Sequence, residues 1–507
     1  MSHPTEPTPP PSSPAWRTSA LLGIAVAVVA LCLRLPALHE SLWVDELHTA
    51  WVVADGMEPI PVRATMGNQS PLYFYGVWLC TQIFGTHEWS LRLPSLIGGL
   101  LAAGLLTAAA HRWTRDGWTA LGIGVVAAID GDWIFYATEA RAYSLVLVLG
   151  LGQLLLACRL LREDRFALWA ALVFLSLTQL YLHYSTLLFT GAVGILLLAF
   201  LPDRARRQRA LVVAFTFLLG AVPSLWHLGA IFERRGNWAQ LFGAWSIGEW
   251  TRWGTIALLL VPALAAWAFH RVRRQDAQTE RPEVPPRWPF LAAVAVLTIG
   301  GAWLSTATGL AALFAGRYLI AAEAALLLLL AALVARLPSV GYRRAAVLAA
   351  VLLAGWFRAP QRVDHLRAEN WQTVTRAIAQ EFAQDTSPPA VAIAAGLIET
   401  DLLRDPEHVS PIWEAYARLP IESLYRLPEE MAPQVSLAYT RPGQLTARQR
   451  RQLAGEAVIV LLVRGYSATA DQVAADVTTS LGGQWRVDVP PTQGGLVQWR
   501  VLRRGET

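Results

Sequence analysis

The residues best suited to chemistry begin a short way after the first apolar segment of the chain. Asp45 and Glu46 follow that segment and have mostly apolar neighbours. A carboxylate in partly apolar surroundings has a raised pKa and can act as a general base near neutral pH. A solvated pair of acids at a membrane surface would give the same pattern. We predict Asp45 and Glu46 as catalytic residues, with His48 in a supporting part.

A second polar group, Glu139, Arg141 and Tyr143, stands where one apolar segment ends and the next begins. An arginine can bind a phosphate through two parallel hydrogen bonds, so this group suits a lipid-phosphate substrate. A capping ion pair between Glu139 and Arg141 would explain the spacing equally well. Glu139 is the third predicted catalytic residue, whereas Asp130 and Asp132 are interpreted as helix-end acids.

Two further candidates also stand at the ends of apolar segments. Arg317, followed by Tyr318, could bind the same phosphate as Arg141, or it could reach only the lipid headgroups, as interfacial arginines commonly do. His183 is a supporting candidate, although a histidine at a helix end is more often a packing residue. The predicted ligands of a donor phosphate are Arg141, Arg317, Tyr143 and Tyr318.

Long apolar segments must position these residues. The chain has 507 residues, of which 54% are hydrophobic and 16% charged, whereas soluble domains carry roughly 25% charged residues. Most of the nearly uncharged segments approach the roughly 20 residues that cross a bilayer as a helix, and backbone in lipid must satisfy its own hydrogen bonds. The segments are 18–33, 93–110, 143–157, 166–182, 185–201, 210–231, 254–269, 289–315, 318–335 and 345–357.

Arginine fills all 42 Lys and Arg positions of the chain. The absence of lysine excludes a Walker-type phosphate loop and a Schiff-base lysine. The arginines cluster in alternate short loops, as expected of cytoplasmic loops. With a cytoplasmic N-terminus, this pattern predicts about 11 spans and places both the 36–90 loop and the C-terminus outside. Residues 71–84 are short and aromatic, so we predict a helix in the membrane interface there.

The composition changes after residue 357, where charged and apolar residues mix. The predicted domains are a disordered cytoplasmic tail (1–17), a transmembrane domain (18–358) that includes the large outer loop at 36–90, and a small soluble α/β domain (359–507). In the last domain we predict strands at 390–395, 435–439, 457–463 and 497–502, and helices near 370–383, 446–454 and 469–481.

The order of these motifs resembles a known family. The motifs are LWVDE at 42–46, SPLYF at 70–74, EWSLRLPS at 88–95, EARAY at 139–143, RY at 317–318 and ENW at 369–371. Together they resemble the bacterial branch of the protein-mannosyltransferase and aminoarabinose-transferase superfamily, the family-39-like C-type glycosyltransferases. The resemblance covers roughly residues 18–335 and implies a mostly α fold, a polytopic transmembrane helix bundle with a small C-terminal α/β domain outside the membrane.

The resemblance also implies an activity. It implies inverting transfer of a sugar from a polyprenyl-phosphate-linked donor to an envelope lipid, glycan or protein at the outer face of the cell (inner) membrane. Asp45 matches the family's acidic residue in the first loop, the base, and Glu139 falls where members carry a second acid. The cofactor stays unknown; if a divalent cation is used, Glu46 or Glu139 would be its ligand. The implied partners are the donor lipid, membrane lipids and an unknown envelope acceptor, with no nucleic acid.

Three other functions fit a polytopic protein. A secondary transporter would have repeated halves and charges at the bilayer midplane, whereas here the acids gather near the predicted outer side. A non-catalytic scaffold would not need an acidic pair and arginines facing one compartment. A polymerase or ligase that uses lipid-linked oligosaccharides shares the outer site and differs from the favoured function through the family motifs alone.

Overall fold

The computed structural model describes residues 15–233, 243–273, 288–359, 368–385, 387–395, 411–431, 434–437 and 445–505. Residues 1–14 of the predicted disordered tail lie outside this part of the chain, and residues 15–17 begin the first helix. The chain divides into two compact units. The helical unit comprises Met1–Leu35 and Pro94–Gln361, and the mixed unit comprises Pro36–Leu93 and Arg362–Thr507. The sequence pattern assigns 36–90 to the transmembrane domain as its outer loop, and the functional domain bounds stay a prediction.

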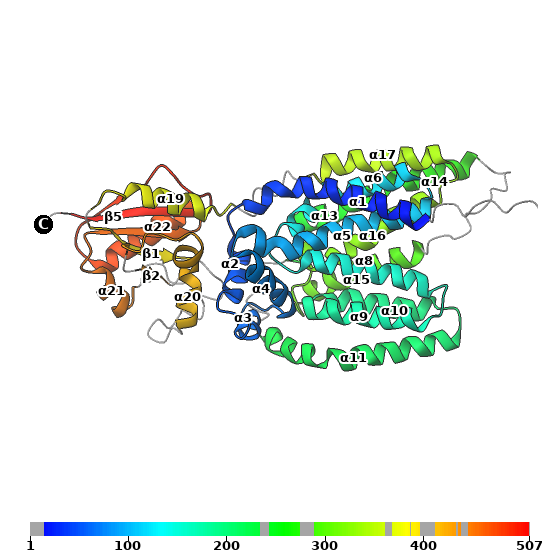
Figure 1. The fold of residues 1–507 in the computed structure, drawn as a ribbon, viewed down its shortest axis with the longest axis horizontal. Helices are drawn as coiled ribbons and strands as arrows, with labels where there is room; N and C mark the ends of the chain where they lie inside the picture. Colours follow the sequence, from blue (N-terminus) through cyan, green and yellow to red (C-terminus); the bar gives the residue numbers. More distant parts are fainter. Residues whose placement is uncertain are drawn as a thin grey trace, which may run out of the picture. The chain divides into compact units, whose positions relative to one another are not determined.

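The helical unit is built from antiparallel apolar helices around one central helix (Figure 1). Its centre is α16 (Ile320–Ala335), which is buried along nearly its whole length and contacts α6, α8, α13, α14, α15 and α17. The helices are α1 (Ala15–Arg34), α5 (Glu88–Thr114), α6 (Gly117–Ile129), α7 (Gly131–Ala137), α8 (Tyr143–Leu160), α9 (Phe166–Leu182), α10 (Thr186–Phe200), α11 (Arg204–Glu233), α13 (Ile247–Leu258), α14 (Val261–Arg273), α15 (Trp288–Ala307), α16 and α17 (Val340–Phe357).

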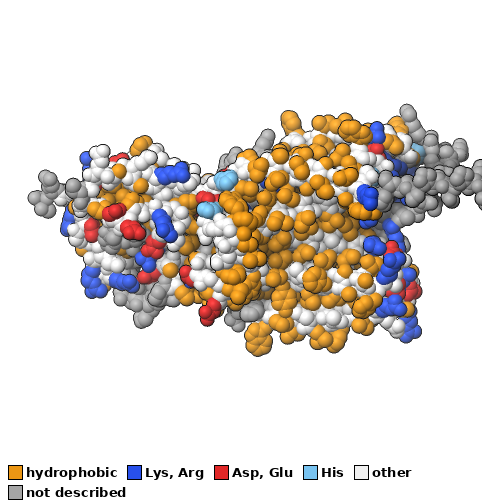
Figure 2. Space-filling view, viewed as in Figure 1, with side chains coloured by type: hydrophobic (Ala, Val, Ile, Leu, Met, Phe, Trp, Pro, Cys, Tyr) orange, Lys and Arg blue, Asp and Glu red, His pale blue; other side chains and the backbone are white. Residues whose placement is uncertain are grey.

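Six of the described helices are long and apolar enough to cross a membrane, or up to eight spans if each of the bent pairs α6–α7 and α13–α14 counts as one. The helices α9, α10 and α16 are apolar but shorter, and counting them as spans too would reach the predicted number, which stays a prediction. Exposed hydrophobic side chains cover the visible face of the helical unit (Figure 2). In water such a surface would be unfavourable, whereas in a bilayer it faces lipid.

The arginine-rich loops meet at one end of the helical unit. Arg209 at the start of α11 forms an ion pair with Asp164 in the α8–α9 loop. Arg344 near the start of α17 pairs with Asp116, which caps α6, at 2.8 Å. Arg343 donates to the carbonyl of Thr114 at the end of α5, at 2.9 Å. The loops that the charge pattern places on one side therefore share one end of the helices, although which compartment they face stays a prediction.

The mixed unit contains three short helices from the predicted outer loop, α2 (Val44–Val53), α3 (Ile60–Met66) and α4 (Leu72–Phe84). Helix α4 coincides with the predicted interfacial helix and leaves Leu72, Leu79, Ile83 and Phe84 exposed. The rest of this unit is an α/β domain with a five-stranded sheet in the order β2-β1-β3-β5-β4. Strands β1, β2 and β3 are parallel to one another, and β5 is antiparallel to β3 and β4.

The sheet contains every strand that the sequence predicts: β1 (Ala390–Ala394), β2 (Gln434–Ser436), β3 (Val458–Arg464) and β5 (Val497–Arg504). The predicted helices are α19 (Trp371–Glu381), α21 (Ala447–Leu453) and α22 (Ser467–Leu481). Strand β4 (Trp485–Asp488), helix α20 (Pro411–Leu419) and the short π-helical turn η4 (Pro420–Leu424) were not predicted. β4 is a short edge strand with two exposed residues, so it lacks the run of apolar residues that identifies the buried strands.

Candidate functional site

The Glu139–Tyr143 segment is a fixed turn between α7 and α8. The backbone carbonyl of Arg141 accepts a 2.7 Å hydrogen bond from the hydroxyl of Ser95, and Ser144 at the start of α8 donates to the carbonyl of Ser95 at 2.6 Å. Within the turn, the backbone N–H of Arg141 donates to the carbonyl of Glu139 at 2.7 Å. Both side chains are nearly inaccessible to solvent, at 1% for Glu139 and 5% for Arg141. Helix α5 therefore positions the turn that carries two predicted site residues.

The predicted phosphate ligands lie together in the helical unit. The hydroxyl of Tyr143 interacts electrostatically with Arg317, Tyr318, Arg141 and Glu139. The ring of His183 lies between two tyrosines, with its centroid 5.4 Å from that of Tyr143 and 5.5 Å from that of Tyr318. We call Glu139, Arg141, Tyr143, His183, Arg317 and Tyr318 the arginine–tyrosine cluster.

The arginine–tyrosine cluster lies at the helix ends opposite the arginine-rich loops. Tyr143 begins α8, whereas that helix ends at Leu160, just before the loop that contains Asp164. His183 caps the end of α9, and the short 3-10 turn Gly316–Tyr318 leads into α16. The hydroxyl of Ser185 contacts both parts, since it lies 2.9 Å from Nδ1 of His183 and 3.4 Å from the carbonyl of Tyr318. The cluster therefore joins the ends of three helices at one level of the bundle.

A buried charge network near this cluster was not predicted. Asp130 caps α7 by accepting the N–H groups of Asp132 and Trp133. Arg358, at the end of α17, binds the carboxylate of Asp130 through two hydrogen bonds of 2.6 and 2.9 Å and lies 2.8 Å from Asp132. The interpretation of Asp130 and Asp132 as helix-end acids is therefore incomplete, because the two side chains also fix the end of a distant helix.

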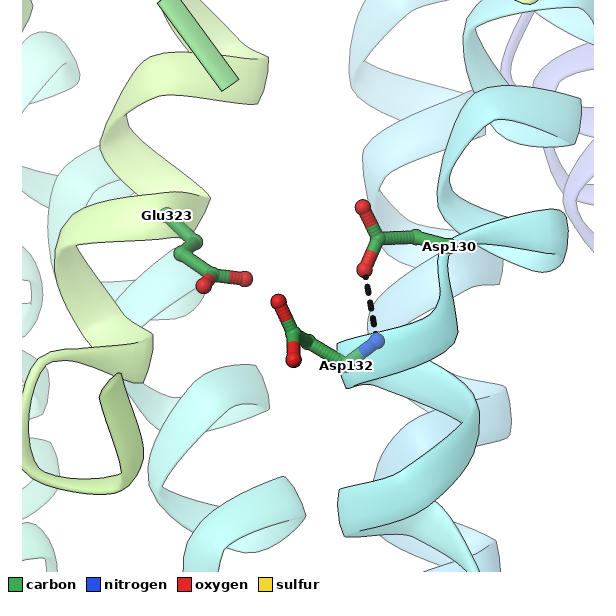
Figure 3. Close-up of side chains that lie close together, drawn as sticks. All are labelled: Asp130, Asp132 and Glu323. Atoms are coloured by element: carbon green, nitrogen blue, oxygen red, sulfur yellow. Dashed lines mark hydrogen bonds between the residues drawn. The ribbon is translucent and has the colours of Figure 1, made fainter. Parts of the chain in front are cut away.

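Arg252 on α13 completes the network. Its Nε donates to Oε1 of Glu323 at 2.9 Å and lies 3.3 Å from Asp132, and its Nη1 donates to the hydroxyl of Tyr136 at 3.3 Å. The carboxylates of Glu323 and Asp132 point toward one another (Figure 3). We call Asp130, Asp132, Arg252, Glu323 and Arg358 the charge network. It connects α7, α13, α16 and α17.

Gly316 links the charge network to the arginine–tyrosine cluster. A Cβ atom added at Gly316 would lie 1.4 Å from Nη1 of Arg252 and 1.9 Å from Cζ of the same side chain. The guanidinium therefore lies directly against the backbone of Gly316, and only a residue without a side chain leaves room for it. The next residue along the chain is Arg317, so Arg252 supports the turn that carries a predicted phosphate ligand.

The three acids of the charge network have the spacing of a metal site. Asp130, Asp132 and Glu323 each offer an oxygen, and these oxygens lie within 4.8 Å of one another. The same carboxylates, however, are held by Arg252 and Arg358, and Arg34 contributes a further positive charge near Asp130. Three arginines thus balance three acids, so the set would accept a divalent cation only if a guanidinium moved away.

Asp45 and Glu46, both in the mixed unit, have different surroundings although they are neighbours on α2. Asp45 is partly exposed. Glu46 is fully buried, and Nε of Arg92 donates to its Oε1 at 2.7 Å while Nη2 donates to Oε2 at 2.5 Å. Arg92 also donates to the carbonyls of Ala37, Leu38 and Glu40. The carboxylate of Glu46 is therefore committed to a structural ion pair, which fits neither a metal ligand nor a group in contact with substrate.

His48 lies in an aromatic cluster of the mixed unit. Its ring centroid is 5.8 Å from that of Trp51, 5.9 Å from that of Phe74 and 5.8 Å from that of Tyr416. Trp51 in turn stacks on Tyr416 at 4.7 Å. His48 is 3% exposed, so these contacts give it a packing role, and its supporting catalytic part stays a prediction.

Sequence signals for the missed residues were present but weak. Glu323 is a lone acid in a long apolar segment, and ionisable residues in such segments are functional candidates by default. Arg252 and Arg358 stand at the margins of apolar segments, where arginines are common. Their importance depends on long-range contacts, because Arg252 binds Glu323 across 71 positions and Arg358 binds Asp130 across 228 positions of the chain. A single sequence does not reveal such contacts.

Comparison with known proteins supports the fold. No family model matches the sequence, and no curated protein matches it. ArnT from Cupriavidus metallidurans in the apo state is similar over 96% of this chain and 99% of its own, with 12% sequence identity and a TM-score of 0.52. The same protein bound to undecaprenyl phosphate is similar over 98% and 100%, with 12% identity and a TM-score of 0.50. The chain therefore has a fold like that of ArnT, a mostly helical bundle with a small α/β domain, as the sequence resemblance predicted.

Proposed function

We propose that this chain is an inverting glycosyltransferase that moves a sugar from a polyprenyl-phosphate-linked donor to a cell-envelope acceptor. The observation that carries the proposal is the arginine–tyrosine cluster, in which Arg141 and Arg317 both lie within electrostatic range of the hydroxyl of Tyr143 at one end of an apolar bundle. Two guanidinium groups and phenolic hydroxyls are donors that suit a phosphate at the membrane surface. The crystal structure of ArnT bound to undecaprenyl phosphate supports a lipid phosphate as ligand of this fold.

In the proposed reaction, the acceptor hydroxyl attacks the anomeric carbon from the face opposite the lipid phosphate. The carboxylate of Asp45 takes the hydroxyl proton as the new carbon–oxygen bond forms. The bond from the anomeric carbon to the phosphate oxygen breaks, and the lipid phosphate leaves with the bonding electrons. Arg141 and Arg317 stabilise the charge that develops on that phosphate. Attack from the opposite face inverts the configuration, as in inverting glycoside hydrolysis with an acceptor in place of water.

We assign the charge network a structural part in this reaction. Arg252 and Arg358 form ion pairs with all three of its carboxylates, and buried acids without such partners would be costly. Transfer should accordingly persist after treatment with a chelator. Loss of transfer on chelation, restored by one divalent cation, would instead favour a metal held by Asp130, Asp132 and Glu323.

The proposed function is tested by transfer in proteoliposomes. The purified chain receives polyprenyl-phosphate-linked sugars with a radiolabelled sugar, together with an envelope lipid and glycan extract as acceptor. Transfer of label to the extract and release of free polyprenyl phosphate support the proposal. Uptake of label into the vesicle interior without cleavage would identify a transporter. Activity with diphosphate-linked oligosaccharides alone would identify a polymerase or ligase.

Asp45→Asn is the most direct test of the proposed base. The change keeps the shape of the side chain but removes its basicity, so the turnover number should fall by about 10²–10⁴-fold. Glu58→Gln is the matched control, because Glu58 is an exposed acid of the same segment, and its turnover should not change. Full activity of Asp45→Asn would leave Asp45 as a solvated acid and would require another base.

A further inference from the structure

Residues far along the chain hold the backbone just before Asp45. The hydroxyl of Tyr425 accepts the N–H of Leu42 at 2.8 Å. The backbone N–H of Trp371 donates to the hydroxyl of Ser41 at 3.1 Å. Both contacts lie within the mixed unit and join positions 383 and 330 residues apart. The segment that leads into α2 is therefore held by the α/β domain as well as by Arg92.

Glu369 acts on the first turn of α2 itself. Its carboxylate is 1% exposed and accepts hydrogen bonds from Nε of Arg464 at 2.7 Å and from Nε1 of Trp371 at 3.2 Å. Burial raises the pKa of this carboxylate, and the backbone N–H of Val44 is among the nearby donors that oppose the rise. Val44 is the first residue of α2, and the first N–H groups of a helix need acceptors from outside the helix. A negative charge at this position also interacts favourably with the positive end of the helix dipole.

The far end of α2 is held by the same domain. Trp51 stacks on Tyr416 at 4.7 Å and on Trp413 at 5.8 Å, both of which belong to α20. Burial raises the pKa of both Glu369 and Tyr425 above their ordinary values. The tyrosine hydroxyl is therefore protonated at neutral pH, so it can accept the N–H of Leu42 and donate a hydrogen bond of its own.

We propose that the C-terminal α/β domain positions the proposed base, because Glu369 and Tyr425 fix the first turn of α2 and with it the carboxylate of Asp45. This inference rests on the proposed function, in which Asp45 removes the acceptor proton. Glu369 and Tyr425 are positioning residues and touch no reacting atom. A base displaced by about 1 Å can lose about 10²-fold in rate, so loss of either contact should be measurable as slower turnover.

Amide hydrogen exchange tests the contacts without reference to activity. Tyr425→Phe removes the acceptor of the Leu42 N–H, and Glu369→Gln removes the charge at the N-terminus of α2 while keeping its shape. In the purified full chain, both changes should speed exchange in a peptide covering residues 41–47, by roughly five- to tenfold for one lost hydrogen bond. Asp488→Asn is the matched control, because it breaks ion pairs with Arg486 on β4 and Arg503 on β5. Unchanged exchange in both test variants would overturn the proposal.

Kinetic measurements then distinguish positioning of the base from a general contribution to the stability of the fold. Both variants should lower the turnover number about 10- to 100-fold at an unchanged KM for the donor, whereas loss of folded protein alone would lower the active fraction and leave the turnover per folded molecule intact. In an Asp45→Asn background, either change should have little further effect, because there is no base left to position. A full additional loss in that background would show that Glu369 and Tyr425 act by another route and would overturn the proposal.

The failure of the proposed function has a different signature. If Asp45→Asn keeps full turnover while the exchange changes appear as expected, Asp45 is not the base, and the α/β domain merely braces α2. If Asp45→Asn is inactive but the two variants keep full turnover despite faster exchange, the base stands and its positioning by this domain is wrong.

Discussion

A methyl group at position 316 should break the contact between the charge network and the arginine–tyrosine cluster. Gly316 has no positive φ angle, so alanine is acceptable to the backbone. The added Cβ, however, would lie 1.4 Å from Nη1 of Arg252, far inside any possible contact distance. In Gly316→Ala the guanidinium must therefore move, and the cost of the substitution comes from Arg252.

The magnitude follows from what Arg252 would leave behind. Its partner Glu323 is 1% exposed and lies 2.7 Å from Nη2 of Arg252, whereas Arg358 is 3.6 Å from the same carboxylate. Removing one partner of a buried ion pair costs about 3–5 kcal/mol. Because Arg358 remains nearby, we expect the lower end of this range, about 3 kcal/mol of the free energy of unfolding.

The assay is equilibrium unfolding in mixed detergent micelles. Gly194→Ala on α10 is the control, because a Cβ there meets no atom within 4 Å, and alanine in a helix should stabilise by about 0.5–1 kcal/mol. Arg252→Ala combined with Gly316→Ala should be much less costly than the sum of the two changes, since no guanidinium remains to clash. Strictly additive costs would refute the reasoning, as would a stable Gly316→Ala protein.

Three further predictions concern the phosphate ligands, the membrane orientation and the partly buried ion pair of Asp116 and Arg344. Arg141→Lys and Arg317→Lys should each weaken use of the donor in transfer assays, and the double variant should deviate from additivity by about 0.5–3 kcal/mol if both arginines bind one phosphate. A reporter fused after Arg206 should be cytoplasmic and one fused within the C-terminal domain external; two reporters on the same side would contradict the predicted topology. The hydrogen bond from Arg344 lowers the pKa of Asp116 in the folded protein well below its usual range. The ion pair therefore stabilises the fold above the ordinary aspartate pKa of about 4, and this stabilisation is lost as the pH falls through the lower pKa of the folded state. At pH 7 the free energy of unfolding of Asp116→Asn should therefore be lower than that of the unchanged chain, and this difference should shrink in strong acid.

The fold was predictable because it is determined by local patterns. The length of an apolar run determines whether a helix can span a bilayer, and the buried strands β1 and β3 are dominated by apolar residues in the sequence. The grouping of 36–93 with the C-terminal domain was not predictable in this way. It depends on contacts such as that between Leu42 and Tyr425, and no local property of either segment indicates them.

The candidate site was predictable to the extent that its residues mark helix ends. Arg141, His183 and Arg317 each stand where an apolar segment begins or ends, and a shared topology brings such ends to one level. The charge network lacks such a marker. Its acids and arginines come from four helices, and their types alone fit solvated helix ends equally well.

The choice between the two adjacent acids of α2 shows what burial adds to a sequence pattern. Asp45 and Glu46 have the same chemistry and nearly the same neighbours, so the sequence assigned both to catalysis. An acceptor hydroxyl must come within about 2.6–3.2 Å of its base. Glu46 is 0% exposed and bound at both oxygens by Arg92, so an acceptor could reach it only by displacing that arginine from the buried pair. Asp45 is partly exposed, and its backbone is fixed by the same turn that Glu46 anchors. The pair therefore divides into one acid that holds the helix in place and one whose carboxylate stays partly open to solvent, as the proposed base must.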